Sequence, residues 1–300
     1  MKLSIAICTF NRADLLRHCL QSLVDQEDAG EEFEVLVIDN NSRDNTLDVT
    51  NEFLKKLKNL RIVHERNQGL SHARNRAIEE AAGEWVCYLD DDAKAHPTLL
   101  VESMKVINGK SYSCFGGVYL PWYKYGQPKW FKDAYASNKK PYNQPTALKG
   151  EQHLSGGIFY VKRELLIQLN GFSTDLGMSG KKVAYGEETE LQLRIRNMGL
   201  DTVYIPDIKI DHLVPQYKLD VSWFLNGAKA LGRDQVKMGM IKKNPISFIY
   251  ELIIMVGLTT KDALWHSLKL LKPDYYLENW KIDVLRKGYK RLGMLKEIIS

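Results

Sequence analysis

Short apolar runs alternate with helical segments through the first third of the chain. Residues 2–10, 33–40, 60–65 and 84–90 are each apolar and rich in β-formers, and a helical segment follows each of the first three. Strands that alternate with helices pair in parallel through right-handed crossovers. A continuous apolar run is also typical of a strand that is buried on both faces. The sequence therefore predicts an α/β fold, with a mostly parallel, Rossmann-like sheet flanked by helices.

Local signals set the expected helix boundaries. Asn11 is expected to cap the first helix, the second is expected over residues 46–58, and the third should run from Ser71 to a glycine stop at Gly83. Each helix then begins shortly after the carboxyl end of a strand.

The pattern changes after the fourth strand. Residues 118–145 show no clean period but are rich in aromatic side chains, which either stack on sugar rings or cover the sheet. Residues 156–172 predict a strand, a helix and a glycine stop. A helix over 187–198 and a strand over 202–207 follow, and the chain is mostly helical from 221 onward.

Charge separates the end of the chain from the rest. We therefore expect a domain of residues 1–220 and a basic helical extension of residues 221–300. Of the formal net charge of +5, residues 237–300 carry +6, which leaves −1 for the remainder. A basic extension favours an anionic partner such as membrane headgroups or phosphates. The apolar stretch 246–258 contains Glu251 and is shorter than the roughly 20 residues that a membrane-spanning helix needs.

Cysteine usage indicates the redox compartment. The 4 cysteines are too sparse for a disulfide scaffold, and they form neither a CxxC motif nor a zinc-like spacing with histidine. We expect a reducing, cytoplasmic setting. No nucleic-acid partner is expected.

Polar residues gather where the predicted strands end. Thr9, Asp39 and Asp90 occupy these carboxyl ends, where ligands bind in open parallel sheets. Asp90 is followed by Asp91 and Asp92. Three adjacent carboxylates suit a hard divalent cation such as Mg²⁺ or Mn²⁺. A solvated turn before a helix is the other interpretation.

Three further sites each have a functional interpretation and a structural one. Arg74 follows a glycine turn near the same edge, although such an arginine alone is more often a surface residue. Glu188 lies three residues before Leu191 on an apolar stripe, so burial should raise its pKa toward that of a general base. Glu187 and Glu188 also suit the first turn of a helix, where acids favour the dipole. His212 follows a strand and is either structural or a metal ligand.

Six segments together carry a family resemblance. SIAICTFNR, VLVIDNNSRDNT, NQGLSHARNRA, YLDDD, SGGIFYVKRELL and GEETELQLRIRNMG, in this order, resemble the inverting family 2 glycosyltransferases of GT-A fold. The resemblance covers about residues 3 to 215.

The resemblance implies a metal-dependent transfer from a nucleotide sugar. Mn²⁺ or Mg²⁺ would be held by Asp90, Asp92 and His212, and Glu188 would be the base, with Glu187 as the second candidate because relatives carry Glu-Asp here. Gly156 and Gly157 would allow the backbone to approach the sugars closely. The residues implied at the donor nucleotide are Thr9, Asn11, Arg12, Asp39, Asn41, Asn67, Arg74, Asp90, Asp91 and Arg233.

The resemblance also narrows the substrates. The chain has no QxxRW segment, which processive relatives carry, so single additions are expected. The donor is expected to be a UDP-sugar and the acceptor a glycan or lipid-linked hydroxyl, in cell-surface polysaccharide biosynthesis. A sugar nucleotidyltransferase and a non-catalytic nucleotide-sugar or glycan-binding protein are the alternatives. Peripheral contact of the C-terminal helices with the inner face of the membrane and homo-oligomer formation are both left open.

Overall fold

The chain forms two compact units. The computed structural model describes residues 1–30, 32–109, 112–176 and 186–300. The first compact unit, which we call the sheet unit, comprises residues 1–122, 136–175 and 187–213. The second, the helical unit, consists mainly of residues 123–135 and 214–300. The predicted domain boundary between residues 220 and 221 stays a prediction.

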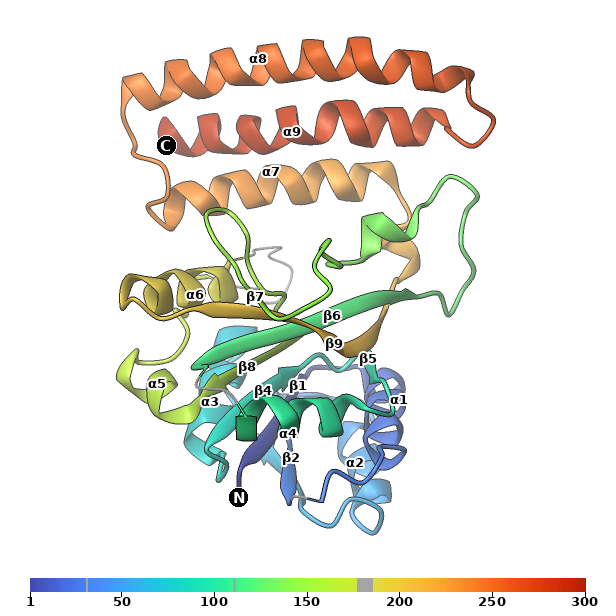
Figure 1. The fold of residues 1–300 in the computed structure, drawn as a ribbon, viewed down its shortest axis with the longest axis vertical. Coiled ribbons are helices and arrows are strands. Elements are labelled where there is room, and N and C mark those ends of the chain that lie inside the picture. Colours follow the sequence, from blue (N-terminus) through green and yellow to red (C-terminus); the bar gives the residue numbers. More distant parts are fainter. Residues whose placement is uncertain (31, 110–111, 177–185) are drawn as a thin grey trace. The chain divides into compact units, whose positions relative to one another are not determined.

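The first four strands are parallel, as predicted. β1 (Leu3–Thr9) lies between β2 (Phe33–Asp39) and β4 (Trp85–Leu89), and β3 (Leu60–His64) forms the outer strand beside β2 (Figure 1). In register, Thr9 lies opposite Asp39. The polar residues that follow these strands therefore share one edge of the sheet.

The remaining strands extend the sheet in mixed directions. β8 (Ile158–Lys162) is antiparallel to β4, and β6 (Cys114–Trp122) is antiparallel to β8. β9 (Thr202–Leu213) runs parallel to β6, and β5 (Ala93–Ala95) and β7 (Thr146–Ala147) pair antiparallel with β9. The sheet is therefore mostly parallel in its first half and mixed in its second.

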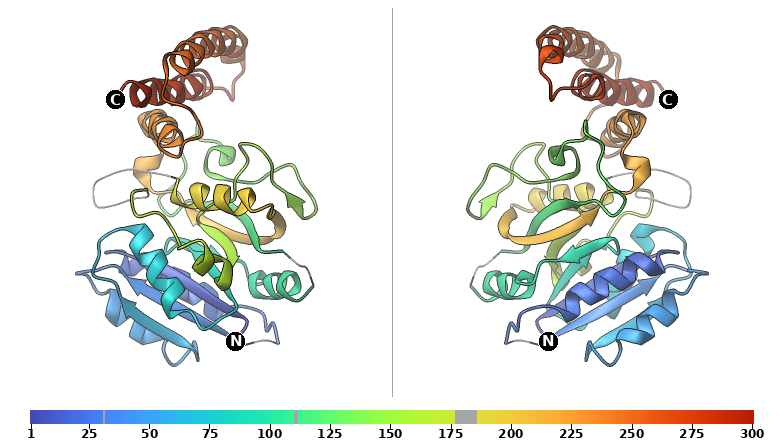
Figure 2. Two further views of the ribbon diagram at one scale, coloured as in Figure 1. Left: turned by 90° about the vertical axis from the view of Figure 1, so that its left-hand side faces the viewer. Right: turned by 90° about the vertical axis from the view of Figure 1, so that its right-hand side faces the viewer.

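Helices cover both faces of the sheet, which explains the continuous apolar strands. Ile5 and Ile7 pack with helices on one face, whereas Ala6 and Ile38 pack with helices on the other. Figure 2 shows helices on both faces of the sheet. The first face is covered by α1 (Ala13–Val24), α2 (Thr46–Phe53) and α4 (Leu99–Gly109), and the second by α3 (Leu70–Glu80), α5 (Arg163–Gln168) and α6 (Glu187–Asn197).

Three local expectations near the N-terminus are wrong. Arg12, not Asn11, occupies the N-cap of α1, because Asn11 adopts a left-handed φ of 52°. α2 ends at Phe53 rather than at residue 58. Gly83 is not a left-handed stop, since α3 ends at Glu80. A Cβ on Gly83 would lie 2.6 Å from the backbone nitrogen of Ser4, so this glycine permits close packing on β1.

Two longer segments also differ from expectation. β9 continues to Leu213, so His212 lies within a strand and not after one. Residues 118–122 belong to β6, so the aperiodic segment begins later than predicted. Tertiary pairing with β5 and β6 extends both strands beyond what their local sequences indicate.

Three long helices make up most of the helical unit. α9 (Leu277–Ile298) lies between α7 (Val221–Lys237) and α8 (Pro245–Ser267) (Figure 1). Gly232 of α7 and Gly293 of α9 meet where the two helices cross, since a Cβ on either would collide with a carbonyl oxygen of the other helix. Short 3₁₀ turns occupy Asp133–Ala136, Gln216–Lys218 and Leu268–Leu271. Among the described residues, no helix combines the length and apolar composition that crossing a bilayer requires.

Part of the aromatic segment belongs to the helical unit. Phe131 is buried, and its ring lies 5.8 Å from that of Phe224 on α7. Asn279 of α9 donates to the Trp130 carbonyl at 2.6 Å and to the Tyr135 hydroxyl at 3.0 Å. These aromatic residues therefore pack on helices, which neither of the two sequence interpretations anticipated.

Candidate active site

The three adjacent aspartates occupy a tight turn at the carboxyl end of β4. The backbone nitrogen of Ala93 donates to the Asp90 carbonyl at 3.1 Å, which closes the turn between β4 and β5. Asp91 and Asp92 are buried, at 4% and 6% exposure. Buried carboxylates require compensation, because desolvation penalises the charged form.

His212 reaches this turn through strand pairing. Ala93 of β5 lies opposite His212 of β9. His212 Nε2 consequently lies 3.2 Å from Asp90 Oδ2 and 3.2 Å from Asp92 Oδ1. Among the described residues, Asp90, Asp92 and His212 form the only group with metal-ligand chemistry, and their ligand atoms lie within 4.8 Å of one another.

The surroundings of His212 suit metal binding. Its Nδ1 lies 3.1 Å from the carbonyl oxygen of Leu213, which can only accept, so Nδ1 can donate there. Nε2 faces the two carboxylates; it can donate to them or, in the tautomer protonated at Nδ1 alone, offer its lone pair to a cation. Carboxylate oxygens with one imidazole suit Mn²⁺ or Mg²⁺, and a second hydrogen bond from the ring is typical of histidine ligands. The residues present therefore fit a divalent cation.

Arg12 offsets the charge of the other aspartate. Its Nη1 donates to Asp91 Oδ1 at 3.0 Å and to Asp92 Oδ2 at 3.3 Å. Burial raises the pKa of Asp91 to about 7, with Asp92 adding to the rise and Arg12 opposing it. Burial also acts against the charge of Asp90, but His212 and Arg74 outweigh it and lower the pKa of Asp90 to about 2.

Arg74 is buried, contrary to the interpretation as a surface residue. It is 3% exposed and lies over the rings of Tyr88, Phe159 and Phe172. Its Nη1 donates to Glu187 Oε1 at 2.9 Å, whereas Asp90 and Glu188 lie at 3.9 and 4.0 Å. Arg74 therefore links the aspartate turn to the acidic pair of α6. Its assignment to the nucleotide base stays a prediction.

The two glutamates of α6 differ in their surroundings. The Glu187 side chain is 5% exposed and paired with Arg74, whereas that of Glu188 is 22% exposed. Burial and the neighbouring Glu187 charge raise the pKa of Glu188 to about 8, and Arg74 only partly counteracts them. A carboxylate that is partly accessible and has a raised pKa suits a general base. The pair was left unresolved by the sequence, and this contrast favours Glu188.

Two glycines separate these groups. A Cβ on Gly156 would lie 2.9 Å from Arg74 Nη2 and 3.2 Å from the Glu188 carboxyl carbon. A Cβ on Gly157 would lie 3.1 Å from Asp90 Oδ2 and 3.3 Å from His212 Cδ2. The glycine pair therefore leaves room between the acidic pair and the metal-ligand group.

The loops after β1 and β2 are joined to each other. The backbone nitrogen of Asn11 donates to Ser42 Oγ at 3.0 Å, and Asn11 Oδ1 accepts from the backbone of Arg43 at 2.7 Å. Asp39 Oδ1 accepts from the backbone of Ser42 at 2.9 Å. Buried Thr9 ends β1, its carbonyl accepting from the backbone of Asn40. Asn41 has a left-handed φ of 70°.

Asn40 is a residue that the sequence interpretation did not select. Its Nδ2 donates to the carbonyl oxygens of Glu65 and Asn67, at 3.1 and 2.7 Å, and its Oδ1 accepts from Gly69 at 2.8 Å. It thereby holds the loop that contains Asn67 against the end of β2. Its position directly after Asp39, at the end of β2, could have identified it from the sequence.

Arg233 belongs to the helical unit. It lies on α7, where its Nε and Nη2 donate to Asp234 at 2.7 and 3.0 Å. Its contribution to donor binding stays a prediction.

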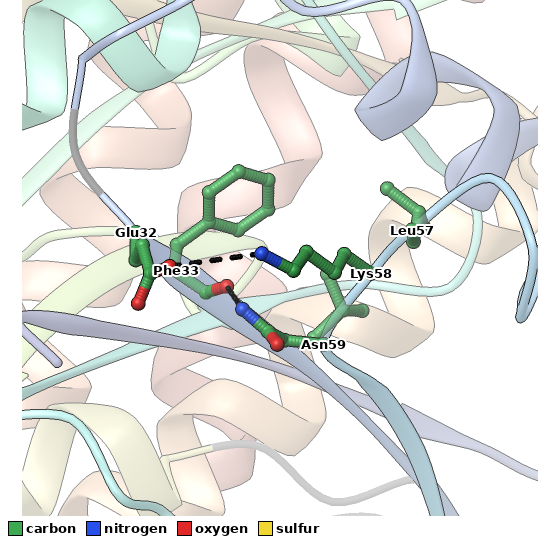
Figure 3. Close-up of a pocket in the computed structure, with 6 residues that line it drawn as sticks. Glu32, Phe33, Leu57, Lys58 and Asn59 are labelled. Carbon is green, nitrogen blue, oxygen red and sulfur yellow. Dashed lines mark hydrogen bonds and ion pairs between the residues drawn. The ribbon is translucent and has the colours of Figure 1, made fainter.

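A hollow at the other end of β2 lacks such chemistry. It measures about 250 Å³, and Figure 3 shows Lys58 near Glu32 and Asn59 donating to the Phe33 carbonyl. It lies where β2 begins, whereas the aspartates lie where β4 ends. The chemistry of the sheet unit therefore gathers at the carboxyl edge.

This sheet, with carboxylates at its carboxyl edge, places the protein among the GT-A glycosyltransferases. Residues 4–169 match the family described as glycosyl transferase family 2. The chain belongs to this family.

Several curated relatives match only part of their own length. An uncharacterised glycosyltransferase YibD of Escherichia coli is 35% identical over 33% of this chain and 28% of its own. The poly(ribitol-phosphate) β-glucosyltransferase of Bacillus spizizenii is 37% identical over 31% of this chain and 15% of its own. The glucosyl-dolichyl phosphate glucuronosyltransferase of Haloferax volcanii is 22% identical over 75% of this chain and 73% of its own.

Solved structures share the fold. The mannosyltransferase PcManGT of Pyrobaculum calidifontis, in complex with GDP-Man and Mn²⁺, has a TM-score of 0.65 and 20% identity, over 97% of this chain and 87% of its own. Residues 1–349 of S. aureus TarS, in complex with UDP, give a TM-score of 0.58 at 18% identity, over 98% and 90% of the two chains.

Proposed function

We propose that this protein is a metal-dependent, inverting glycosyltransferase that adds single sugars from a nucleotide-sugar donor to an acceptor hydroxyl. The observation that carries the proposal is the convergence of His212 of β9 on Asp90 and Asp92 of the turn after β4, with Glu188 across the glycine pair. Transfer needs a charge-stabilising group at the leaving diphosphate and a base at the acceptor, and these two groups supply both.

The residues have separate duties in this mechanism. Asp90, Asp92 and His212 would hold Mn²⁺ or Mg²⁺, which would supply Lewis acidity toward the leaving diphosphate. Glu188 takes the proton of the attacking hydroxyl, and its raised pKa makes that transfer favourable. Attack opposite the leaving group inverts the anomeric carbon. Arg74 holds Glu187 in place, so Glu187 serves to position the α6 turn.

The donor loops lie at the ends of β1 and β2. The linked backbone of Asn11, Ser42 and Arg43, with Asp39 beside it, offers polar groups to a nucleoside. We propose a UDP-sugar as the donor. TarS binds UDP and UDP-GlcNAc, whereas PcManGT binds GDP-Man, so GDP-sugars are the comparison in the test.

The acceptor is proposed to be a glycan or a lipid-linked glycan of a cell-surface polymer. Relatives named for poly(ribitol-phosphate) and for a dolichyl phosphate sugar support this class of acceptor. We place the enzyme in the cytoplasm, at the inner face of the membrane.

A donor screen tests the proposal. UDP-, GDP- and TDP-sugars are incubated with the full chain and with Mn²⁺, Mg²⁺ or EDTA, and nucleotide release is measured. Release from one nucleotide class that requires the metal supports the proposal, and NMR of the product then gives the anomeric configuration. Release that is equal in EDTA would refute the metal dependence, and a retained configuration would refute inversion.

A further inference from the structure

The outer side of α8 carries an apolar stripe in two parts. Its side chains are exposed by 56% to 85%, and within each part a spacing of three and four residues places them on one face of the helix. Gly257, Thr260 and Lys261 lie between the two parts. We call this face the α8 stripe. It consists of Ile246, Ile249, Tyr250, Ile253, Val256, Leu264 and Trp265, continued by Leu268 and Leu271 of the following turn.

Exposed apolar residues in the sheet unit are arranged differently. Leu54 follows α2 and Ile167 lies on α5, at 46% and 53% exposure. Scattered residues of this kind are normal on a soluble surface, whereas apolar side chains gathered on one face of a helix mark an interaction site. The stripe also borders an open hollow of about 1070 Å³ lined in part by Gly257, Thr260 and Trp265.

The acidic side chains of this region face inward. Within residues 240–273, all of them described, the acids are Glu251 and Asp262. Glu251 pairs with Arg291 of α9, and Asp262 pairs with Lys287 of α9 at 2.7 Å. Both are buried, at 6% and 7% exposure. Asp274, two residues after Lys272, is exposed but lies outside α8, so the outer face of α8 itself presents no carboxylate.

Basic side chains border the stripe instead. Lys261 is exposed on α8 itself, and Lys242 and Lys272 are exposed at its two ends. Each lysine near an anionic bilayer contributes about 1 kcal/mol to binding at the membrane surface. Tyr250 and Trp265 add aromatic rings of the kind that settle at the headgroup level.

We propose that the α8 stripe is a docking surface for an anionic lipid bilayer, on which α8 lies in the plane of the interface. An apolar face bordered by lysines is the pattern of a helix that lies on a membrane. A second copy of this chain is the less favourable occupant, because it would bring lysines toward lysines with no acid on either stripe. The inference stands apart from the proposed reaction, since it uses only residues of the helical unit.

Vesicle co-sedimentation of the full chain tests the docking surface. Vesicles of phosphatidylcholine with phosphatidylglycerol should bind the protein at low salt, and added salt should weaken the binding. The pair Ile253→Gln and Leu264→Gln should lower the partition coefficient by about tenfold or more, because the inserted apolar area is lost. Lys261→Gln and Lys272→Gln should each lower it by about fivefold.

The matched control moves the same chemistry to the other unit. The pair Leu54→Gln and Ile167→Gln removes exposed side chains of the same two types from the sheet unit and should leave the partition coefficient unchanged. Circular dichroism and thermal melts establish that each variant is folded.

Three outcomes would overturn the proposal. Full-length protein that stays in the supernatant with anionic vesicles at low salt is the first. Equal losses in the α8 and control pairs would show that the stripe has no special role. A dimer, measured by light scattering, that the pair Ile253→Gln and Leu264→Gln converts to monomer would assign the stripe to a second copy.

Discussion

The carboxyl edge of the sheet and the helical unit treat their carboxylates in different ways. In the helical unit, Glu251 and Asp262 each have one cation of α9 as partner. In the sheet unit, five carboxylates, those of Asp90, Asp91, Asp92, Glu187 and Glu188, share Arg12, Arg74 and His212.

This difference distinguishes carboxylates that stabilise the fold from carboxylates that can bind a ligand. One-to-one pairing leaves no charge for a ligand, whereas an excess of carboxylates must bind protons or a cation. The raised pKa values of Asp91 and Glu188 mean that protons can neutralise part of this excess charge. A divalent cation at Asp90, Asp92 and His212 would neutralise another part.

Removing a metal ligand should have the largest effect. Asp92→Asn is expected to lower turnover about a thousandfold or more, because Lewis-acid stabilisation of the leaving group amounts to several kcal/mol. Nucleotide release with Mn²⁺ measures the loss, and the melting temperature should change little because the asparagine keeps the shape of the site. Turnover at the wild-type rate would remove Asp92 from the metal site.

Removing the base should be nearly as severe. Glu188→Gln is expected to lower kcat by about 10² to 10⁴, with donor affinity retained, because an amide cannot accept the proton. Steady-state kinetics with donor and acceptor measure both quantities. A variant that loses donor binding along with rate would make Glu188 a structural residue.

The raised pKa of Glu188 also predicts two pH dependences. Wild-type kcat should rise with pH up to about 8, since the base acts when deprotonated. A folded-state pKa above the ordinary 4.5 contributes stability that is present below pH 4.5 and lost as pH rises through about 8. Denaturation of Glu188→Gln should therefore lack this decline. A decline equal to that of the wild type would assign the raised pKa to another group.

Breaking one ion pair in each unit tests the comparison directly. Arg74→Met and Arg291→Met each leave a buried carboxylate unpaired, which destabilises a protein by about 3 to 5 kcal/mol. Urea denaturation measures this loss. The pH profile of kcat should shift only in Arg74→Met, because only Arg74 lies near Glu188. A shift of equal size in Arg291→Met would show that the two sets of charges are not independent.

Glycine substitutions give smaller effects of opposite sign. Gly232→Ala should destabilise the helical unit by about 1 to 3 kcal/mol, because its Cβ would meet the Lys290 carbonyl of α9. Gly257→Ala, in the interior of α8 with no neighbour within 4 Å, should stabilise it by about 1 kcal/mol through helix propensity. Thermal melts distinguish the two, and equal effects would contradict the tight crossing of α7 and α9.

A similarly small effect is expected beside the metal-ligand group. Gly157→Ala should weaken Mn²⁺ binding by about fivefold, because its Cβ crowds Asp90 and His212 and about 1 kcal/mol of strain follows. Gly109→Ala is the control, since no atom lies within 4 Å of its added Cβ. Calorimetric titration with Mn²⁺ gives both affinities. Unchanged affinity in Gly157→Ala would place the ion elsewhere.

The sequence predicted what local patterns determine. The apolar runs that become β1, β2 and β4 are buried on both faces, so composition alone marks them, and the polar residues after them must share an edge. Glu188 was identified as a candidate base because its place on the apolar stripe of α6 is also local.

Contacts between segments that are distant in the sequence could not be predicted from local patterns. Arg12 and Asp91 are 79 residues apart, and Arg74 and Glu187 are 113 apart. Neither pairing leaves a local pattern in the sequence, so Arg74 alone was interpreted as a surface residue. β9 likewise extends past its predicted end because β5 and β6 pair with it. The two ion pairs and the length of β9 all depend on how distant segments pack, which no local stretch of sequence indicates.

The pairing of β5 with β9 also orders events during synthesis. Ribosomes deliver a chain from its N-terminus, so Asp90 and Asp92 emerge well before His212. A nascent chain that ends before β9 holds the donor loops without the imidazole opposite Ala93. On the proposed mechanism, such a chain lacks its third metal ligand, and the capacity to consume nucleotide sugars arrives only when the last strand closes the sheet.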